Sequence, residues 1–161
     1  MDGGTIELER APIAYVGEIV IRPLHRVDDE AAYTRFGMAL AAEDLRTRLA
    51  GPARWSSELA PRLFGFDGTP FAAFDDRGQI LGVAGIVEND ISLAVRSDLK
   101  RHGLGRVLLR HILSHAFEHG FTELGGSVLA ENRPMIELAK AVGFRVTGFE
   151  GPLVSIRLCL P

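Results

Sequence analysis

The chain has little cysteine, one residue in 161, and this scarcity excludes an intrachain disulfide. Small secreted domains stapled by disulfides carry several cysteines, so the sequence instead fits a reducing compartment, and we expect a cytoplasmic protein. The single thiol, Cys159, lies in an apolar C-terminal run. We expect it to be a small buried hydrophobe rather than a nucleophile.

Long apolar runs, strong net charge and internal repeats are absent as well. No run approaches the roughly 20 apolar residues that span a bilayer, and the N-terminus lacks the pattern of a signal peptide, so we expect no membrane partner. A net charge of −3 argues against a nucleic-acid partner. These absences leave a globular protein whose oligomeric state the sequence does not predict.

The apolar patterns predict one mixed α/β domain over residues 18–161, since 161 residues suit a single sizeable core. Residues 1–17 form an N-terminal extension: a short tail, an extra strand or the end of a linker. The expected order is a strand (18–24), two helices (about 28–38, capped by Asp28 or Asp29, and 42–49), three strands (70–74, 80–87, 91–95), a long helix (104–119), a strand (123–129), a helix from residue 132 and two strands (144–149, 153–160).

The segment 100–106, Lys-Arg-His-Gly-Leu-Gly-Arg, is the most informative part of the chain because it joins a strand pattern to the long helix pattern. Gly103 and Gly105 let the backbone turn tightly with its N–H groups facing outward. A helix that begins there adds unpaired N–H donors and the positive end of its dipole. Three basic side chains add charge: Lys100, Arg101 and Arg106. The segment therefore predicts a phosphate-binding turn.

Two familiar phosphate-binding motifs do not fit this segment. A Rossmann fingerprint needs a third glycine where the chain has Leu108. A P-loop needs Gly-Lys-Ser/Thr, but Arg106 and Val107 follow the second glycine. We therefore expect the turn to bind the diphosphate of a nucleotide-bearing cofactor through another motif.

A second motif follows about thirty residues downstream, over 132–144 (Asn-Arg-Pro-Met-Ile-Glu-Leu-Ala-Lys-Ala-Val-Gly-Phe). Asn132 can cap a helix, Pro134 suits its first turn, and Gly143 can end it. Together the two segments resemble the GNAT superfamily of N-acetyltransferases, with its Gln/Arg-x-x-Gly-x-Gly/Ala loop and Asn-x-x-x-Ile-x-Leu-x-x-x-x-Gly-Phe signature. Lys100 at the Gln/Arg position is a departure. The resemblance covers about 20–160 and is strongest over 90–149.

The resemblance implies a GNAT fold: a central, mostly antiparallel sheet flanked by helices and splayed between strands 4 and 5. It implies acetyl-CoA (coenzyme A) as cofactor, with the pantetheine arm lying in the splay as an added strand would. The N–H of Val95 would polarise the thioester carbonyl. The cofactor-binding residues implied are Leu93, Ala94, Val95, Lys100, Arg101, His102, Gly103, Leu104, Gly105, Arg106 and Asn132.

The general base implied by the resemblance is a carboxylate just before the cofactor strand. Lysine has a pKa near 10.4, so an acceptor amine must lose a proton before it can attack. Bacterial Pat-type protein lysine acetyltransferases use a Glu here, and the matching position is Asp90, with Glu88 as the other candidate. The same residues are also typical of a polar turn. Many GNAT enzymes have a Tyr acid where this chain has Ala139, so we assign no general acid.

The leading hypothesis is an acyltransferase of the EC 2.3.1 class that acetylates a primary amine, most like the Pat-type branch and so a protein lysine. One alternative is a small-molecule amine acceptor, and another is a non-catalytic acyl-CoA sensor. Histidines recur at 111, 115 and 119 on the long helix. Because its apolar stripe points elsewhere, we expect them to face solvent or a neighbouring edge, and we expect no metal site.

Overall fold

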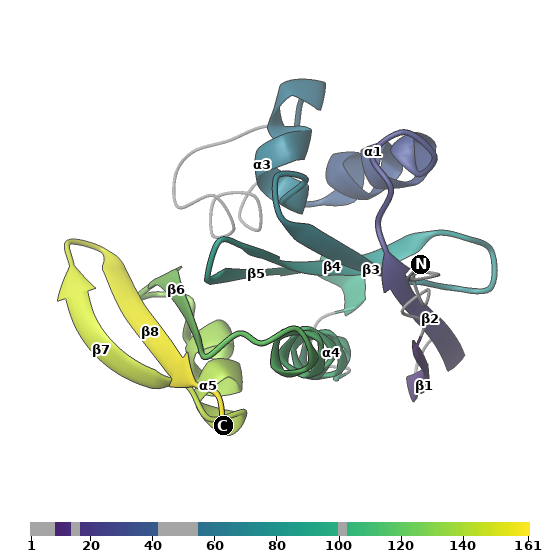
Figure 1. The fold of residues 1–161 in the computed structure, drawn as a ribbon. Helices are drawn as coiled ribbons and strands as arrows, with labels where there is room; N and C mark the ends of the chain where they lie inside the picture. The colour runs from purple at the N-terminus through teal and green to yellow at the C-terminus, as the bar shows by residue number, and fades with distance from the viewer. Residues whose placement is uncertain (1–8, 14–16, 42–54, 100–102) are drawn as a thin grey trace.

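The computed structural model describes residues 9–13, 17–41, 55–99 and 103–161, which fold as a sheet with helices on both faces (Figure 1). The strands lie in the order β1-β2-β3-β4-β5-β6-β8-β7. Their bounds are β1 Glu9–Ile13, β2 Gly17–Pro23, β3 Thr69–Phe74, β4 Ile80–Val87, β5 Asp90–Val95, β6 Glu123–Leu129, β7 Arg145–Glu150 and β8 Leu153–Cys159. The helices are α1 Glu30–Ala39, α3 Ala60–Phe64, α4 Leu104–Glu118 and α5 Arg133–Ala141, with short 3₁₀ turns η1 Ser57–Leu59 and η2 Ser97–Leu99.

The sheet is antiparallel except at one seam, where β5 runs parallel to β6. Within these two described strands, the register pairs Asp90 with Gly125 and no later residue. Beyond that pair the strands diverge, which confirms the expected mostly antiparallel sheet splayed between its fourth and fifth strands. The numbering moves up by one because β1, inside the N-terminal extension, adds a strand beside β2. The domain boundary at residue 17 remains a prediction.

Helices cover both faces of the sheet (Figure 1). On one face α4 buries the predicted stripe against the inward side chains of β2, β3 and β4; the stripe is Leu104, Leu108, Ile112 and Ala116. On the other face α1 and α3 form a second core rich in aromatic rings, with Tyr33 and Phe64 at 5.0 Å between ring centroids. Burial of these apolar side chains supplies the main driving force for folding.

Asp29 precedes α1 at the predicted N-cap position, but its side chain does not cap the helix. It accepts a hydrogen bond from the backbone N–H of His25 at 2.7 Å and forms a two-pronged ion pair with Arg22 at 2.8 and 2.9 Å. The Arg22 guanidinium also stacks over the Phe74 ring. Hydrogen bonding from Arg22 holds the pKa of Asp29 below its usual value. This pair ties the end of β2 to the start of α1.

Two expectations about single side chains were wrong. His111 and His115 are buried, with rings 4.7 and 5.0 Å from the Phe71 ring, because α4 lies across the sheet and covers a wider arc than its apolar stripe. Only His119, at the end of the helix, is exposed as expected of the three. Cys159 is exposed, because side chains alternate along β8 and those of Val154 and Ile156 take the inward positions. The described residues hold no group of three or more potential metal ligands.

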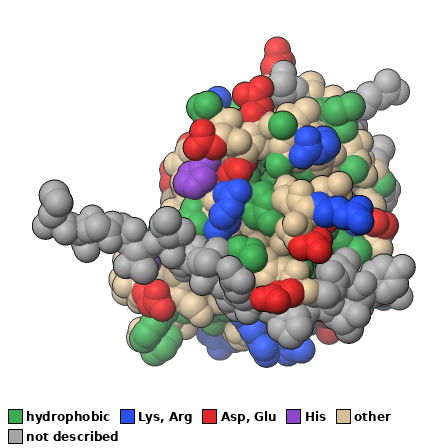
Figure 2. Space-filling view, turned by 90° about the vertical axis from the view of Figure 1, so that its right-hand side faces the viewer, with side chains coloured by type: hydrophobic (Ala, Val, Ile, Leu, Met, Phe, Trp, Pro, Cys, Tyr) green, Lys and Arg blue, Asp and Glu red, His purple; other side chains and the backbone are tan. Residues whose placement is uncertain are grey.

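No helix in the described part of the chain is long and apolar enough to cross a membrane. Figure 2 shows acidic and basic side chains interspersed on one face, with no broad area of one sign among the described residues in view. The predicted helix 42–49 lies outside the described residues.

Candidate active site

The diverging strands β5 and β6 open a pocket of about 470 Å³. The N-terminal turn of α4 and the start of α5 complete its walls. The lining is mostly apolar, with a few polar groups such as Ser127, Asn132 and Arg106. Such a lining is typical of a site that binds a mainly apolar arm with a charged end.

Alternate N–H and C=O groups of the β5 backbone point into this gap. The N–H of Arg96 donates to the carbonyl of Leu81 on β4 at 2.8 Å. In an antiparallel ladder, successive residues alternate the side to which their N–H and C=O groups point. The register with β4 is continuous from Asp90 to Val95, so the main-chain groups of Val95 and Leu93 point away from β4 and toward β6. Since β6 has diverged there, these groups face the pocket.

The N-terminus of α4 stands at the pocket because of its two glycines. Gly103 is the N-cap and adopts the left-handed conformation with φ +85°, which favours glycine over residues with a side chain. At Gly105 the reason is space: a Cβ there would lie 3.3 Å from Leu138 Cδ2 and 3.5 Å from Leu93 Cδ2. The glycine pair therefore allows a tight turn and a close approach of α4 to β5 and α5.

The second sequence motif forms α5 as predicted. The side chain of Asn132 accepts a hydrogen bond from the N–H of Met135 at 3.4 Å and so caps the helix, and Pro134 lies in the first turn. Gly143 follows the helix with φ +110°. Because α5 begins at the end of β6, Asn132, Pro134 and Met135 all line the pocket.

Most of the residues proposed for the cofactor meet at this pocket. Seven of them line it: Leu93, Ala94, Val95, Gly103, Gly105, Arg106 and Asn132. Leu104 does not, because its side chain is buried in the core under α4. Lys100, Arg101 and His102 lie outside the described residues. The lining from β6, Gly126, Ser127 and Val128, was not predicted, because only the pairing of strands distant in sequence brings it there.

A second pocket, of about 400 Å³, lies on the side of the sheet that carries α3. Its polar lining is Arg62 from α3, Asp67 from the following turn, and Asp90 and Ser92 from β5. Asp90 is exposed at the first position of β5. Glu88 instead occupies the two-residue turn between β4 and β5, with φ +56°, and is not among the residues lining either pocket.

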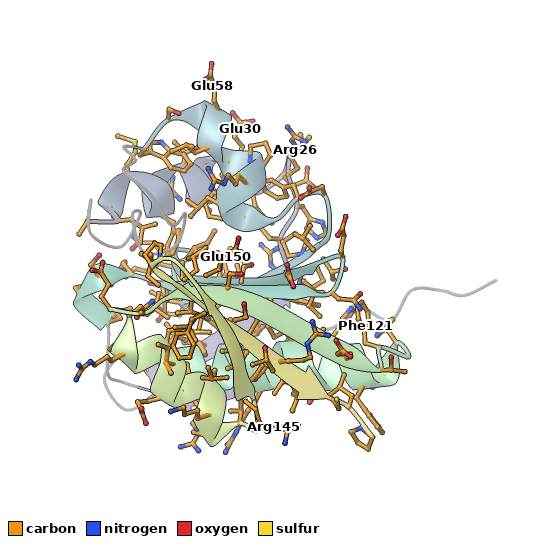
Figure 3. All side chains as sticks on the ribbon, turned by 90° about the vertical axis from the view of Figure 1, so that its left-hand side faces the viewer. Arg26, Glu30, Glu58, Phe121, Arg145 and Glu150 are labelled. Atoms are coloured by element: carbon orange, nitrogen blue, oxygen red, sulfur yellow. The ribbon has the colours of Figure 1, made fainter. Side chains whose placement is uncertain are left out.

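The two pockets adjoin across β5, because Ile91 and Ser92 line both of them. Figure 3 shows the hairpin of β7 and β8 from the side. The end of β7 that carries Glu150 lies nearer to α1 and η1, which carry Glu30 and Glu58, than the end with Arg145 does (Figure 3). A ligand in the gap and a second ligand near Asp90 would thus meet at the start of β5.

The sheet is open between two parallel strands, and main-chain groups face the gap. A helix that begins after a glycine stands at the opening of this gap. Together these features are the architecture of an acyl-CoA-dependent transferase. The particular family follows from the sequence: the model of the acetyltransferase (GNAT) family matches residues 38–144, and the chain belongs to that family. The match confirms the expected family and fold. Members of this family use acetyl-CoA as acyl donor.

Three relatives show how this chain compares with known members. It is 34% identical over 73 residues to the [ribosomal protein bS18]-alanine N-acetyltransferase of Salmonella typhimurium, a match over 44% of this chain and 49% of that protein. The chain therefore spans about half the length of this curated relative. The GNAT domain of S. lividans PAT superposes with a TM-score of 0.83 at 22% identity, over 95% of this chain and 97% of that one. Spermidine N-acetyltransferase from Vibrio cholerae, solved with CoA and spermine, gives 0.68 at 15% identity, over 88% and 93%.

The described residues fit acetyl-CoA. The pocket offers outward-facing main-chain groups of Leu93 and Val95 for an extended amide-bearing arm. The N-terminus of α4, with Arg106 beside it, offers N–H donors and positive charge for a diphosphate. These two donor sets match the two chemically distinct parts of the cofactor.

Proposed function

We propose that this chain transfers an acetyl group from acetyl-CoA to a primary amine, and that the acceptor is the side chain of a protein lysine. The observation that carries the proposal is the meeting of two pockets at Ile91 and Ser92, one suited to the cofactor and the other lined by Asp90. We assign the domain to residues 18–161 and its setting to the cytoplasm, where the single cysteine fits a reducing environment.

When bound, acetyl-CoA supplies the acetyl group as a thioester. The Val95 N–H, which points into the gap, would donate a hydrogen bond to the thioester carbonyl oxygen and stabilise the charge that develops there. The Asp90 carboxylate, directly or through water, would accept a proton from the acceptor ammonium. The neutral amine nitrogen would then form a bond to the acetyl carbon while the carbon–sulfur bond breaks with its electron pair leaving on sulfur. The second proton lost by the nitrogen would pass to that thiolate or to water, which gives the amide and free CoA.

Asp90 is favoured over Glu88 as the base because it lines the second pocket beside the shared residues, whereas Glu88 lies in the turn. Asp67 adds a second carboxylate to the same pocket. Two carboxylates favour a cationic acceptor, as lysine is at neutral pH. The acceptor pocket also holds the guanidinium of Arg62, so it carries two carboxylates against one positive charge, whereas Arg106 and the N-terminus of α4 bring positive charge to the cofactor pocket.

A second acceptor is favoured by one observation. The Salmonella relative is named as an alanine N-acetyltransferase of ribosomal protein bS18, and its 34% identity is higher than that of the solved structures described above. The α-amine of a protein N-terminus would need the same base and the same pocket. The named substrate of the Vibrio enzyme is spermidine, which makes a small polyamine a third acceptor to test.

The proposal is tested by following free thiol with acetyl-CoA and one acceptor at a time: a lysine-bearing protein, a peptide with N-terminal alanine and blocked lysines, and spermidine. Release that requires the lysine-bearing protein supports the proposal. Release only with the blocked peptide or with spermidine reassigns the acceptor. Tight CoA binding without release from any acceptor overturns the enzymatic function and leaves an acyl-CoA sensor.

The role of Asp90 is tested by Asp90→Asn, which keeps the size of the side chain and removes its basicity. We expect turnover to fall about 100-fold, because general-base catalysis contributes about 10² or more, with CoA affinity unchanged. Asp76→Asn, at an exposed position in the β3–β4 turn, is the matched control and should leave turnover unchanged. Glu88→Gln decides between the two candidates: if it abolishes turnover while Asp90→Asn does not, the base is Glu88.

A further inference from the structure

We infer that Gly125 on β6 is a positioning residue, which keeps the Asp90 carboxylate in place by leaving room beside it. This inference rests on the proposed function, in which Asp90 is the general base. The two residues are the paired position that joins β5 to β6. Their closeness is therefore fixed by the sheet at the point where the two strands begin to diverge.

The space that a side chain at Gly125 would occupy adjoins the Asp90 carboxylate. A Cβ built on Gly125 would lie 3.3 Å from Asp90 Oδ1, closer than the 3.4–4 Å of an ordinary van der Waals contact. It would also lie 3.4 Å from the carbonyl oxygen of Ile156 on the neighbouring strand β8. A side chain at this position would thus be held between a rigid backbone and a carboxylate, and the carboxylate is the part that can move.

The backbone does not require glycine here. Gly125 is not among the glycines with a left-handed φ in the described residues, which are Gly65, Gly78, Gly103, Gly120, Gly143 and Gly151. Its N–H donates to the carbonyl of Asn89 at 2.8 Å, an ordinary bond that any residue except proline can make. The absence of a side chain is therefore the property that matters, and Asp90 is the side chain that benefits.

The displacement matters because of where Asp90 lies. Asp90 lines the acceptor pocket, and the residues after it, Ile91 and Ser92, line both pockets. Gly125 itself lines neither pocket. A shift of the carboxylate by a few tenths of an ångström would move the base relative to the acceptor nitrogen while leaving the cofactor contacts in place. Proton transfer depends steeply on such distances.

The test is Gly125→Ala, with Gly148→Ala on the edge strand β7 as matched control, since a Cβ at Gly148 meets nothing within 4 Å. Thiol release and CoA affinity are measured for both. We expect kcat to fall about fivefold or more in Gly125→Ala, with CoA affinity and the KM for acetyl-CoA unchanged, and no change in Gly148→Ala. An unchanged kcat in a folded Gly125→Ala protein would overturn the inference.

The double variant Asp90→Asn/Gly125→Ala separates positioning from a structural role. Asparagine fills the same space as aspartate, so any loss of stability from the added methyl group persists, but the base is gone. We expect Gly125→Ala to lower kcat in the wild-type background and to have no further effect on kcat beside Asp90→Asn. An equal effect in both backgrounds would show that Gly125 acts through stability alone.

The outcomes also distinguish this inference from the proposed function. If wild-type protein releases no thiol with any acceptor, the proposed function fails, and the positioning role that rests on it fails as well. If wild-type protein turns over and Asp90→Asn does not impair it, the assignment of the base fails. If both hold and Gly125→Ala behaves like Gly148→Ala, only the positioning role fails.

Discussion

At the scale of single residues, the structure separates side chains that hold the fold from those that line the candidate site. Asp29 belongs to the first group: its carboxylate forms an ion pair with Arg22, accepts a hydrogen bond from the N–H of His25 and is buried. Asp90 belongs to the second, because it is exposed at the start of β5 and lines the pocket. The same residue type therefore does different work according to its partners and burial.

Asp29→Asn should destabilise the protein by about 2 kcal/mol at pH 7, because it leaves Arg22 without its charged partner. The pKa of Asp29 is lowered by folding, so the stabilisation is present above the unfolded value near 3.9 and is lost as the pH falls through the lower folded value. Urea unfolding at pH 7 and below pH 4 measures it. The gap between wild type and variant should shrink at the lower pH.

The matched control is Asp28→Asn, one residue earlier and exposed to solvent. It changes the same net charge without touching the Arg22 ion pair, so its unfolding free energy should stay within about 0.5 kcal/mol of wild type. A loss in Asp28→Asn as large as that in Asp29→Asn would show that net charge, not the pair, is responsible.

Residue-scale prediction from sequence succeeded where the determinant is local. Gly103 at the N-cap of α4 and Asn132 at that of α5 follow from backbone conformation and capping, which short patterns encode. His111 was misplaced because its burial depends on Phe71, forty residues away on β3. No sequence pattern pointed to Gly125, since the role proposed for it depends on its pairing with Asp90 in the sheet.

At the scale of elements, α4 connects the sheet to the candidate diphosphate site. Its buried face packs on one side of the sheet, and its first turn lines the pocket. The hydrophobic period predicted both its length and its apolar stripe. The position of its N-terminus against β5 and α5 could not be predicted, because it depends on the close approach that Gly105 permits.

Gly105→Leu should lower CoA affinity by at least tenfold, because the added side chain meets Leu138 and Leu93 and fills part of the pocket. Isothermal titration with CoA measures the change. Ser114→Leu, at an exposed position of the same helix, adds the same side chain away from the pocket and should bind CoA as wild type does. Undiminished affinity in Gly105→Leu would contradict the placement of the cofactor.

At the scale of the whole molecule, the overall order of strands and helices was predictable, because each element carries a clear period and each turn its usual residues. The polar turn expected just before the cofactor strand is present as Glu88 and Asn89, which join the antiparallel strands β4 and β5. The insertion of β8 between β6 and β7 follows no local pattern and is set by the sheet as a whole. The splay between β5 and β6 was predicted from the family resemblance and not from hydrophobic periodicity.

The splay has a consequence for how the molecule unfolds. Since β5 and β6 share one paired position, strands β1–β5 and β6–β8 are two blocks whose cohesion along that seam depends little on backbone bonds. A ligand that bridges the seam should make the two blocks unfold together: at 100 times its Kd, CoA should add about 2.7 kcal/mol of stability.

Hydrogen exchange at the Leu93 and Val95 amides should slow on CoA addition, while the Arg96 amide, already bonded to Leu81, should change less. Equal slowing at all three amides would mean that CoA stabilises the whole molecule rather than the gap between β5 and β6 in particular.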